Sequence, residues 1–97
     1  MKAFKSDGRY KYHNQGLGYI AQFRWAAMDD RLQFIALVKA LVELYGPEKE
    51  KEMSAQGYTY WKFNENWRCE QNRNAKRRRI YLKDESALTY ILLRMGE

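Results

Sequence analysis

Four consecutive cationic side chains, Lys76 to Arg79, are the residues in this sequence whose type and spacing best suit a chemical role. They lie in the stretch NRNAKRRRIYLKDE, residues 72–85, directly before a short apolar segment. Lysine and arginine neutralise phosphates and release their counterions, so a cationic run of this density favours an anionic partner. The alternative interpretation is a solvated loop that is kept polar for solubility.

Aromatic side chains alternate with cations in two nearby segments. In YTYWKF, residues 58–63, the two tyrosines and the lysine share one face. In the strand pattern of residues 77–83, Tyr81 shares a face with Arg79 and Lys83. If the two strands are neighbours, they form one uncovered sheet face on which unpaired bases can stack, while the alternative is that the tyrosines are ordinary cross-strand pairs. The predicted nucleic-acid or partner-binding residues are Arg73, Lys76, Arg77, Arg78, Arg79, Tyr81, Lys83, Tyr58, Tyr60 and Lys62.

The overall charge supports the same expectation. The 97 residues include 18 Lys and Arg against 12 Asp and Glu, which gives a formal charge of +6 and a pI near 9.5. Residues 1–17 carry a net charge of +3 and residues 74–83 carry +5, so the rest of the chain is slightly acidic. Such clustering is what a localised contact patch requires, although net charge does not choose among nucleic acid, an acidic protein face and a membrane surface.

The sequence offers little for catalysis or metal binding. His13 and Cys69 are the only residues of their types, so no nucleophile-and-base pair and no HxxxH or CxxC spacing is present. The paired carboxylates Asp29-Asp30 and Asp84-Glu85 begin predicted helices, where acidic side chains satisfy free amides. We therefore expect a non-catalytic protein, not an enzyme, with no cofactor and no metal.

Cysteine usage and hydropathy predict the compartment. A single cysteine allows no intramolecular disulfide, which is typical of an intracellular protein. The opening residues MKAFKSDGRY lack the apolar core of a signal peptide, and no apolar run approaches the roughly 18 residues of a membrane span. We expect a cytoplasmic protein with no membrane partner.

In the first half of the chain, a strand and a helix are predicted. GYIAQFRWA, residues 18–26, alternates as a half-buried strand does, and residues 28–45 have helical spacing, with Asp29 or Asp30 as the cap and Gly46-Pro47 as the stop. The apolar stripe of this helix is wider than one sheet would cover. We expect the terminal helix to cover the excess, with a dimer or partner interface as the alternative. The excess residues are Leu32, Ile35 and Val42.

In the second half, residues 47–57 are predicted to be a solvated connector, because they mix charge signs and lack apolar periodicity. Residues 58–63 and WRCEQ, 67–71, are expected to form a hairpin, and residues 77–83 to form a further strand. DESALTYILLRMG closes the chain as a helix capped by Asp84.

These elements predict an α+β fold: a single small antiparallel sheet with two helices packed on one face, of the split βαβ, ferredoxin-like kind. Residues 1–17 are expected to be a basic N-terminal arm or edge strand, and residues 18–97 a single α+β domain.

FRW at residues 23–25, a helix ending in LYGP, a Trp-rich strand and RRRIYLKDESALTYILLRMG together resemble a pattern in small uncharacterised accessory proteins of tailed bacteriophages. The resemblance spans most of residues 19–96, and the terminal LLRMG departs from the LLRWG of that pattern. It implies an accessory protein made in the cytoplasm of an infected bacterial cell, where compact proteins serve host takeover by binding and disabling host machinery.

Two functions follow as hypotheses. The first is a nucleic-acid-associated binding module that uses the cationic and aromatic sheet face. The alternative is a phage-type inhibitor or modulator that docks on a host protein such as a nuclease, polymerase or defence complex, because arginine, tryptophan and tyrosine also anchor protein interfaces. The surplus apolar face of the first helix suggests a further hypothesis, a homodimer that forms through that helix.

Overall fold

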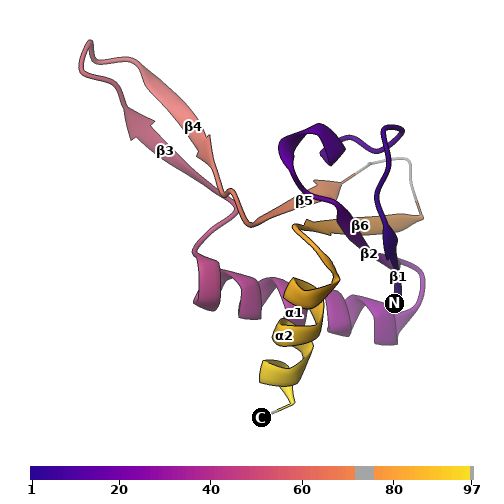
Figure 1. The fold of residues 1–97 in the computed structure, drawn as a ribbon. Helices are drawn as coiled ribbons and strands as arrows, with labels where there is room; N and C mark the ends of the chain where they lie inside the picture. The colour runs from indigo at the N-terminus through magenta and orange to yellow at the C-terminus, as the bar shows by residue number, and fades with distance from the viewer. Residues whose placement is uncertain (72–75, 97) are drawn as a thin grey trace.

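The computed structural model describes residues 1–71 and 76–96, and Figure 1 shows their fold. Strands and helices follow one another in an order that begins with two strands and ends with a helix. The elements are β1 (Lys2–Lys5), a short 3-10 helix (His13–Gln15), β2 (Tyr19–Arg24), α1 (Met28–Tyr45), β3 (Lys49–Met53), β4 (Thr59–Phe63), β5 (Trp67–Gln71), β6 (Arg77–Leu82) and α2 (Glu85–Met95).

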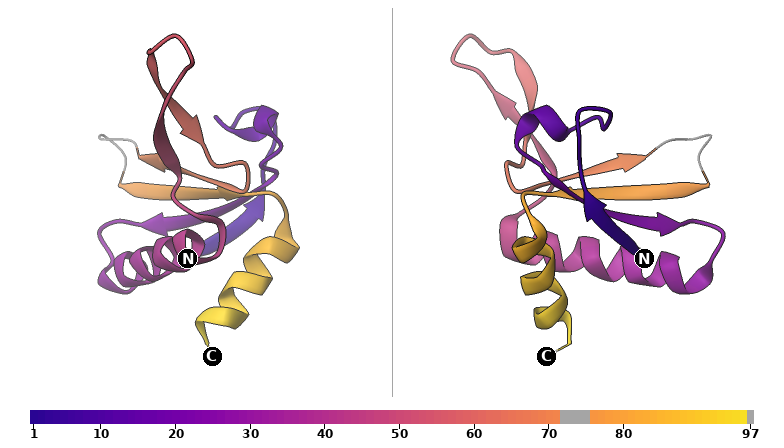
Figure 2. Two further views of the ribbon diagram at one scale, coloured as in Figure 1. Left: turned by 90° about the vertical axis from the view of Figure 1, so that its left-hand side faces the viewer. Right: turned by 45° about the vertical axis from the view of Figure 1, so that its right-hand side comes forward.

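The strands form two separate sheets. The larger one has four antiparallel strands in the order β1-β2-β6-β5, and both helices pack on one of its faces (Figure 2). Because β2 and β5 are each antiparallel to β6, which lies between them, they run parallel to each other and are joined through α1. The predicted α+β class and the placement of both helices on one face are confirmed.

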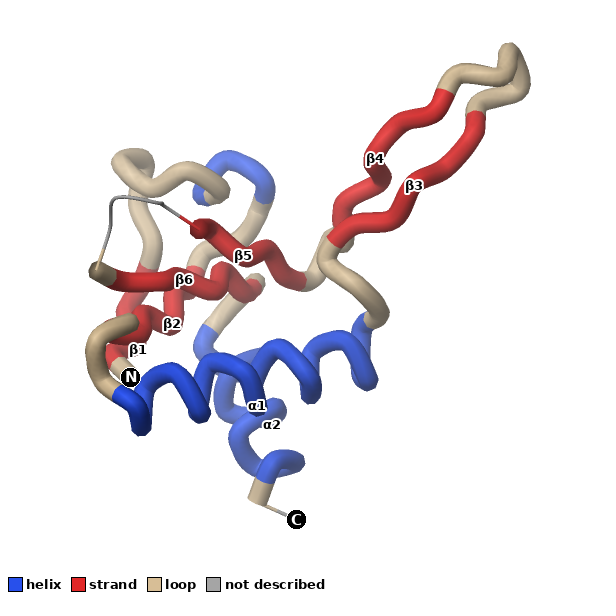
Figure 3. The backbone as a smooth tube through the Cα atoms, turned by 180° about the vertical axis from the view of Figure 1, so that it is seen from behind, coloured by secondary structure: helices blue, strands red, loops and turns tan. Residues whose placement is uncertain are grey.

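The prediction of a single sheet is wrong, because β3 and β4 form a second sheet of their own. Residues 49–53, expected in a solvated connector, are β3 and pair with β4 in the register Lys51 opposite Trp61. β5 therefore pairs with β6 and not with β4. The hairpin projects away from the rest of the molecule (Figure 3), so both of its faces meet solvent and β3 shows no apolar alternation.

The main core lies between the helices and the four-stranded sheet. Alternation in β2 and β6 directs every second side chain to this layer, as predicted for β2. Trp67 closes one end of the core, and its indole N–H donates to the carbonyl of Gly46 at 3.1 Å. The buried residues of this core are Ala21, Phe23, Phe34, Leu37, Leu41, Trp67, Ile80, Leu82, Leu88 and Ile91.

The observed helix ends agree only in part with the caps and stops that the sequence predicts. α1 stops at Tyr45 and Gly46 takes a φ of 88°, as the Gly-Pro stop predicts, and the Asp84 carboxylate caps α2 by accepting from the Ala87 amide at 2.9 Å. The predicted cap of α1 is wrong, since Ala27 is the N-cap and no side chain bonds there. Asp30 instead accepts from the Arg24 amide at 2.7 Å and so fastens the end of β2 to α1.

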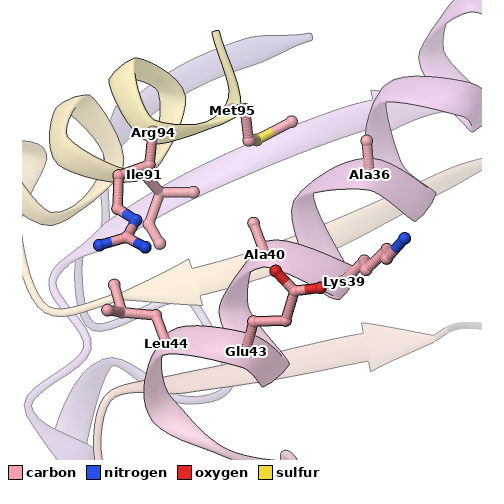
Figure 4. Close-up of a pocket in the computed structure, with 8 residues that line it drawn as sticks. All are labelled: Ala36, Lys39, Ala40, Glu43, Leu44, Ile91, Arg94 and Met95. Carbon is pink, nitrogen blue, oxygen red and sulfur yellow. The ribbon is translucent and has the colours of Figure 1, made fainter. Parts of the chain in front are cut away.

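The expectation that α2 covers the wide stripe of α1 is also wrong. α2 packs beside Ala40 and Leu44, where a groove remains between the helices (Figure 4). Leu32, Ile35 and Val42 lie on another side of α1 and stay exposed, together with Met28. The structure therefore leaves an apolar stripe on α1.

The second face of the sheet is covered by the connection between β1 and β2. Figure 1 shows residues 6–18 in indigo above the sheet, on the side opposite the helices. Tyr12 and Leu17 pack there against Ile20 and Tyr81, and the Tyr12 and Tyr81 rings meet edge to face with centroids 5.0 Å apart. A second, smaller core thus holds the N-terminal residues in place.

We expect Leu17→Ala to lower the free energy of unfolding by about 2–5 kcal/mol, because the change leaves a cavity in this second core. Leu17 is only 1% exposed. Urea denaturation followed by circular dichroism measures the loss. Asn14→Ala, at an exposed position of the same segment, is the control and should change stability by no more than about 0.5 kcal/mol. Equal stability of the two variants would contradict the covered face.

Candidate nucleic-acid interface

The predicted binding residues do not form one surface. Tyr81 is fully buried beneath Tyr12 and Leu17, so the expected uncovered tyrosine face is wrong at this position. Its phenol donates to the Glu70 carboxylate at 2.7 Å, and burial together with this bond raises the pKa of Tyr81 well above its usual range. Tyr81 is therefore a structural residue of the second core.

The predicted hairpin residues lie elsewhere, because β4 pairs with β3 and not beside β6. Tyr60 and Lys62 lie on β4, with Tyr58 just before it, and all three are exposed. Lys83 follows β6 and is exposed, and Arg73 lies outside the described residues. The structure thus separates the predicted set into the arginine run and a distant hairpin group.

The arginine run itself divides between the two sides of the sheet. Arg78 points to the helix side, where its guanidinium lies 4.4 Å from the ring centroid of Trp25. Arg79 points to the other side, donates to the Gln22 side chain at 3.1 Å and lies 3.5 Å from the Glu70 carboxylate. Arg77 shares the side of Arg79 and is exposed.

Strand register brings further polar side chains beside Arg77. Arg24 is directly opposite Arg77, Gln22 is opposite Arg79, and Lys2 on β1 is opposite Gln22. All of them occupy the face away from the helices. Residues 6–18 leave this end of the sheet open except at Arg79, whose guanidinium lies 5.2 Å from the ring centroid of Tyr10. We call this surface the cationic sheet end; it consists of Lys2, Gln22, Arg24, Lys76, Arg77 and Arg79, of which Gln22, Arg24, Lys76 and Arg77 line a shallow hollow.

Local structure fixes the positions of these groups. The Trp25 amide donates to the Lys76 carbonyl at 2.8 Å and closes the end of the β2-β6 ladder. Trp25 in turn meets Phe34 of α1 edge to face, with centroids 5.4 Å apart. The Arg24 amide bond to Asp30 adds a third tie. The cationic sheet end is therefore a rigid part of the fold.

The positive charges of this surface are compensated only in part, and the Arg79-Glu70 ion pair accounts for one of them. Like charges directly opposite each other on neighbouring strands are destabilising, and Arg24 and Arg77 are such a pair. Arg24 has one ion pair, in which its Nε lies 3.5 Å from Asp30, while its side chain stays 79% exposed. Arg77 has no ion pair with any residue that the structure describes. An anion with several oxygens, such as a phosphate group, would relieve this repulsion.

Acidic groups elsewhere on the same side of the sheet are engaged. Glu70 accepts a hydrogen bond from Tyr81 and forms an ion pair with Arg79. Asp7 accepts hydrogen bonds from Arg9 at 2.8–3.2 Å. The side-chain hydrogen bonds from Arg9 lower the pKa of Asp7 to about 2. Arg9 is consequently occupied by an internal partner, which distinguishes it from Arg77.

Other sites in the described chain suit an anion less well. The groove between the helices is lined by Lys39 and Arg94 but also by Glu43, so its charges are mixed (Figure 4). Within residues 1–71 and 76–96, no three His, Cys, Asp or Glu side chains gather as a metal site would require. Neither of the two described helices combines the length and apolar character needed to cross a membrane.

Sequence reasoning missed Lys2, Gln22 and Arg24 as members of the surface. A signal was present, since alternation in GYIAQFRWA places Gln22 and Arg24 on the face away from the helices. The register that sets Arg24 against Arg77 depends on which strands pair, and the sequence does not contain that information. Comparison of the chain with known protein families, with curated proteins and with solved structures gives no match.

A pH titration can test whether Arg9 is occupied. Because the folded pKa of Asp7 lies below the ordinary value of about 3.9, the stabilisation by this pair is present above that value and is lost as the pH falls toward about 2. We expect the Asp7 carboxyl carbon to titrate near pH 2 by NMR, and at a higher pH in Arg9→Gln, which loses the side-chain hydrogen bonds but keeps the backbone one. A wild-type midpoint near the ordinary value would show that Arg9 is unpaired.

Proposed function

We propose that the protein is a small, non-catalytic, nucleic-acid-associated binding module that holds the phosphate backbone at the cationic sheet end. The observation that carries this proposal is the exposed Arg24-Arg77 cross-strand pair, which costs stability unless an anion lies between the two guanidinium groups. Folded proteins commonly tolerate such local costs where binding requires them.

The neighbouring groups support a phosphate ligand in particular. Guanidinium groups bind phosphate oxygens in a bidentate manner, and ammonium groups add point charges. Arg24 and Arg77 supply the first kind, and Lys2 and Lys76 supply the second. Most phosphate-contacting proteins use several such side chains to fix their position on the backbone without reading sequence.

The charge distribution supports an oriented encounter with a polyanion. Most acidic side chains belong to the helices, to the β3-β4 hairpin or to the loops beside them. The two acids on the covered face, Asp7 and Glu70, are bonded to arginines. A polyanion is therefore attracted to the face opposite the helices, and this steering raises the rate of association.

We expect Arg77→Gln to weaken binding to duplex and single-stranded oligonucleotides and to reduce the slope of log affinity against log salt by about 1, because one phosphate contact is lost. Fluorescence anisotropy at several salt concentrations measures both quantities. Arg77 suits this test because its described contacts include no ion pair whose loss would disturb the fold, whereas Arg78 and Arg79 have structural partners.

The matched control is Lys39→Gln, which removes the same charge from an exposed position on the helix side. Its salt slope should equal that of the wild type. If both variants lose affinity equally, only net charge matters and the cationic sheet end is not a site. If the wild type binds no oligonucleotide even at low salt, the nucleic-acid function is wrong and docking to a protein is favoured.

The second candidate function is docking on a protein, as a phage-type modulator of a host enzyme would require. The exposed stripe of α1 favours it: Met28, Leu32, Ile35 and Val42 recur on one side of the helix without cover from the described chain. Apolar stripes of this kind commonly mark protein interfaces. A second copy of the chain is the simplest occupant to test.

If a second copy covers the stripe, light scattering at rising concentration should show a mass approaching twice the 11.7 kDa of one chain. Ile35→Lys should hold the mass at that of one chain, because an interface would bury the ammonium without a partner. A wild type that stays monomeric at every concentration removes the homodimer and leaves a different protein as the occupant.

We also infer a ferredoxin-like frame for the four-stranded sheet. Two features support this frame. A split βαβ unit and its continuation have the chain order seen in β2, α1, β5, β6 and α2. In the sheet, β6 lies between β2 and β5. β1 takes the edge position beside β2 from the N-terminal side of the chain. This frame places both helices behind the sheet and leaves the cationic sheet end uncovered.

A further inference from the structure

The β3-β4 hairpin has two faces of different chemistry. Antiparallel alternation puts Glu50, Glu52, Tyr60 and Lys62 on one face. The other face holds no acidic side chain. We call it the Trp61 face; it consists of Lys49, Lys51, Met53, Thr59, Trp61 and Phe63.

Internal bonds satisfy the acidic face but not the Trp61 face. The Tyr60 hydroxyl donates to Glu52 at 3.0 Å, and the Lys62 ammonium lies 3.7 Å from the same carboxylate. On the Trp61 face, the ammonium groups of Lys49 and Lys51 lie over the indole ring, 4.8 and 5.3 Å from its centroid. Neither lysine forms an ion pair with an acidic side chain of the described residues, so two positive charges adjoin an exposed aromatic ring without a carboxylate partner.

The aromatic groups of this face are unusually exposed for their size. Trp61 is 48% exposed, Phe63 42% and Met53 71%. Side chains this large and apolar are normally buried, and a contiguous exposed group of them marks an interaction surface. A two-stranded ribbon with no covering layer has only marginal stability of its own, so these residues do not form a core.

The base of the hairpin is nevertheless fixed. The Asn64 side-chain amide donates to the carbonyls of Tyr45 at 2.7 Å and Pro47 at 3.2 Å. The ring of Phe63 lies 3.9 Å from the Arg68 guanidinium, which in turn lies 4.1 Å from the ring of Tyr12. The Trp61 face therefore adjoins the covered face of the sheet, and not the helices.

We propose that the Trp61 face binds unpaired bases of a single-stranded nucleic acid, with Trp61 and Phe63 as stacking platforms and Lys49 and Lys51 as phosphate contacts. This inference rests on the proposed nucleic-acid function and names its ligand class. Stacking on aromatic side chains together with nearby cations is the usual basis of single-strand binding without sequence preference. Lys49 and Lys51 lie about 6.8 Å apart along their strand, a separation that suits successive phosphates of an extended strand.

Duplex and protein ligands fit this face less well. In a duplex the base faces are already stacked on one another, so the exposed rings of Trp61 and Phe63 would find no unpaired base to stack on. Protein interfaces are depleted in lysine at their centre, whereas two lysines border Trp61. Charge and shape together favour an unpaired polyanion.

The test uses the whole chain and two fluorescent probes, an oligothymidine and a mixed-sequence DNA duplex of equal length, titrated by anisotropy. Trp61→Leu keeps an apolar side chain opposite Lys51 but removes the flat ring. We expect it to weaken oligothymidine binding by about tenfold and to leave duplex binding within about twofold of the wild type. Tyr90→Leu removes an equally exposed aromatic ring, 48% exposed, from α2 on the other side of the sheet, so it is the matched control and should leave both affinities unchanged.

Amide NMR signals of Glu50 and Lys62 report whether the hairpin stays folded in each variant. If Trp61→Leu unfolds it, the double variant Lys49→Gln/Lys51→Gln retains the indole and replaces it in the test. This variant should lower the salt slope for oligothymidine by about 1.4, since each phosphate contact in a single strand contributes about 0.7. An unchanged slope would then overturn the inference.

The outcomes separate the two proposals. If Trp61→Leu, with its hairpin folded, binds oligothymidine as the wild type does, the Trp61 face is not the site, while duplex binding sensitive to Arg77→Gln would still support the cationic sheet end. Equal losses for Trp61→Leu and Tyr90→Leu would also overturn the inference, because the loss is then not specific to the Trp61 face. A wild type that binds neither probe overturns both proposals.

Discussion

The packing of one arginine between two aromatic rings is the interaction on which the surface of this protein depends. Arg68 is only 8% exposed, and its guanidinium lies between the rings of Phe63 and Tyr12. It donates to the Gln15 side chain at 2.8 Å, whereas its Nε is buried without a hydrogen-bond partner in the described part of the chain. A desolvated cation is costly, and the two ring faces offset part of that cost. Through these contacts Arg68 joins the N-terminal connection, the sheet and the hairpin base.

This contact divides the face opposite the helices into a covered and an open half. Tyr12 and Leu17 are held over Tyr81 and Ile20, so residues 6–18 seal the half of the sheet nearest the hairpin. The connection does not reach Arg24 and Arg77, which stay exposed. Burying apolar area on one half while leaving like charges uncovered on the other is a poor arrangement for stability alone. It is a reasonable one for a surface that meets an anion.

Much of the frame could be predicted from the sequence, because local signals and the fold agree there. β2 alternates, α1 ends at Gly46-Pro47, and Asp84 caps α2. β3 could not be predicted, since a ribbon with solvent on both sides needs no apolar alternation and its KEKEM sequence resembles that of a polar connector. The burial of Tyr81 was missed for a related reason. β6 is covered on both faces at this point, and the covering residues come from a segment about 70 positions away in the chain.

The candidate site was predicted less well than the frame, because its membership depends on strand pairing that the local sequence does not determine. The cationic run was visible, but of its three arginines only Arg77 has no described ionic or aromatic partner, and Arg24 joined the site through strand register. The uncovered face of residues 58–63 was expected to be the tyrosine side alone, yet a strand without a covering layer exposes both sides, and Trp61 is 48% exposed. The cationic sheet end and the hairpin base adjoin opposite ends of β6, which are about 17 Å apart. A flexible polyanion long enough to reach both surfaces would bind the second one intramolecularly, so two weak contacts can act as one stronger site. The fixed link through Arg68 is what makes such joint binding geometrically possible, because it holds the hairpin base in one place relative to the sheet.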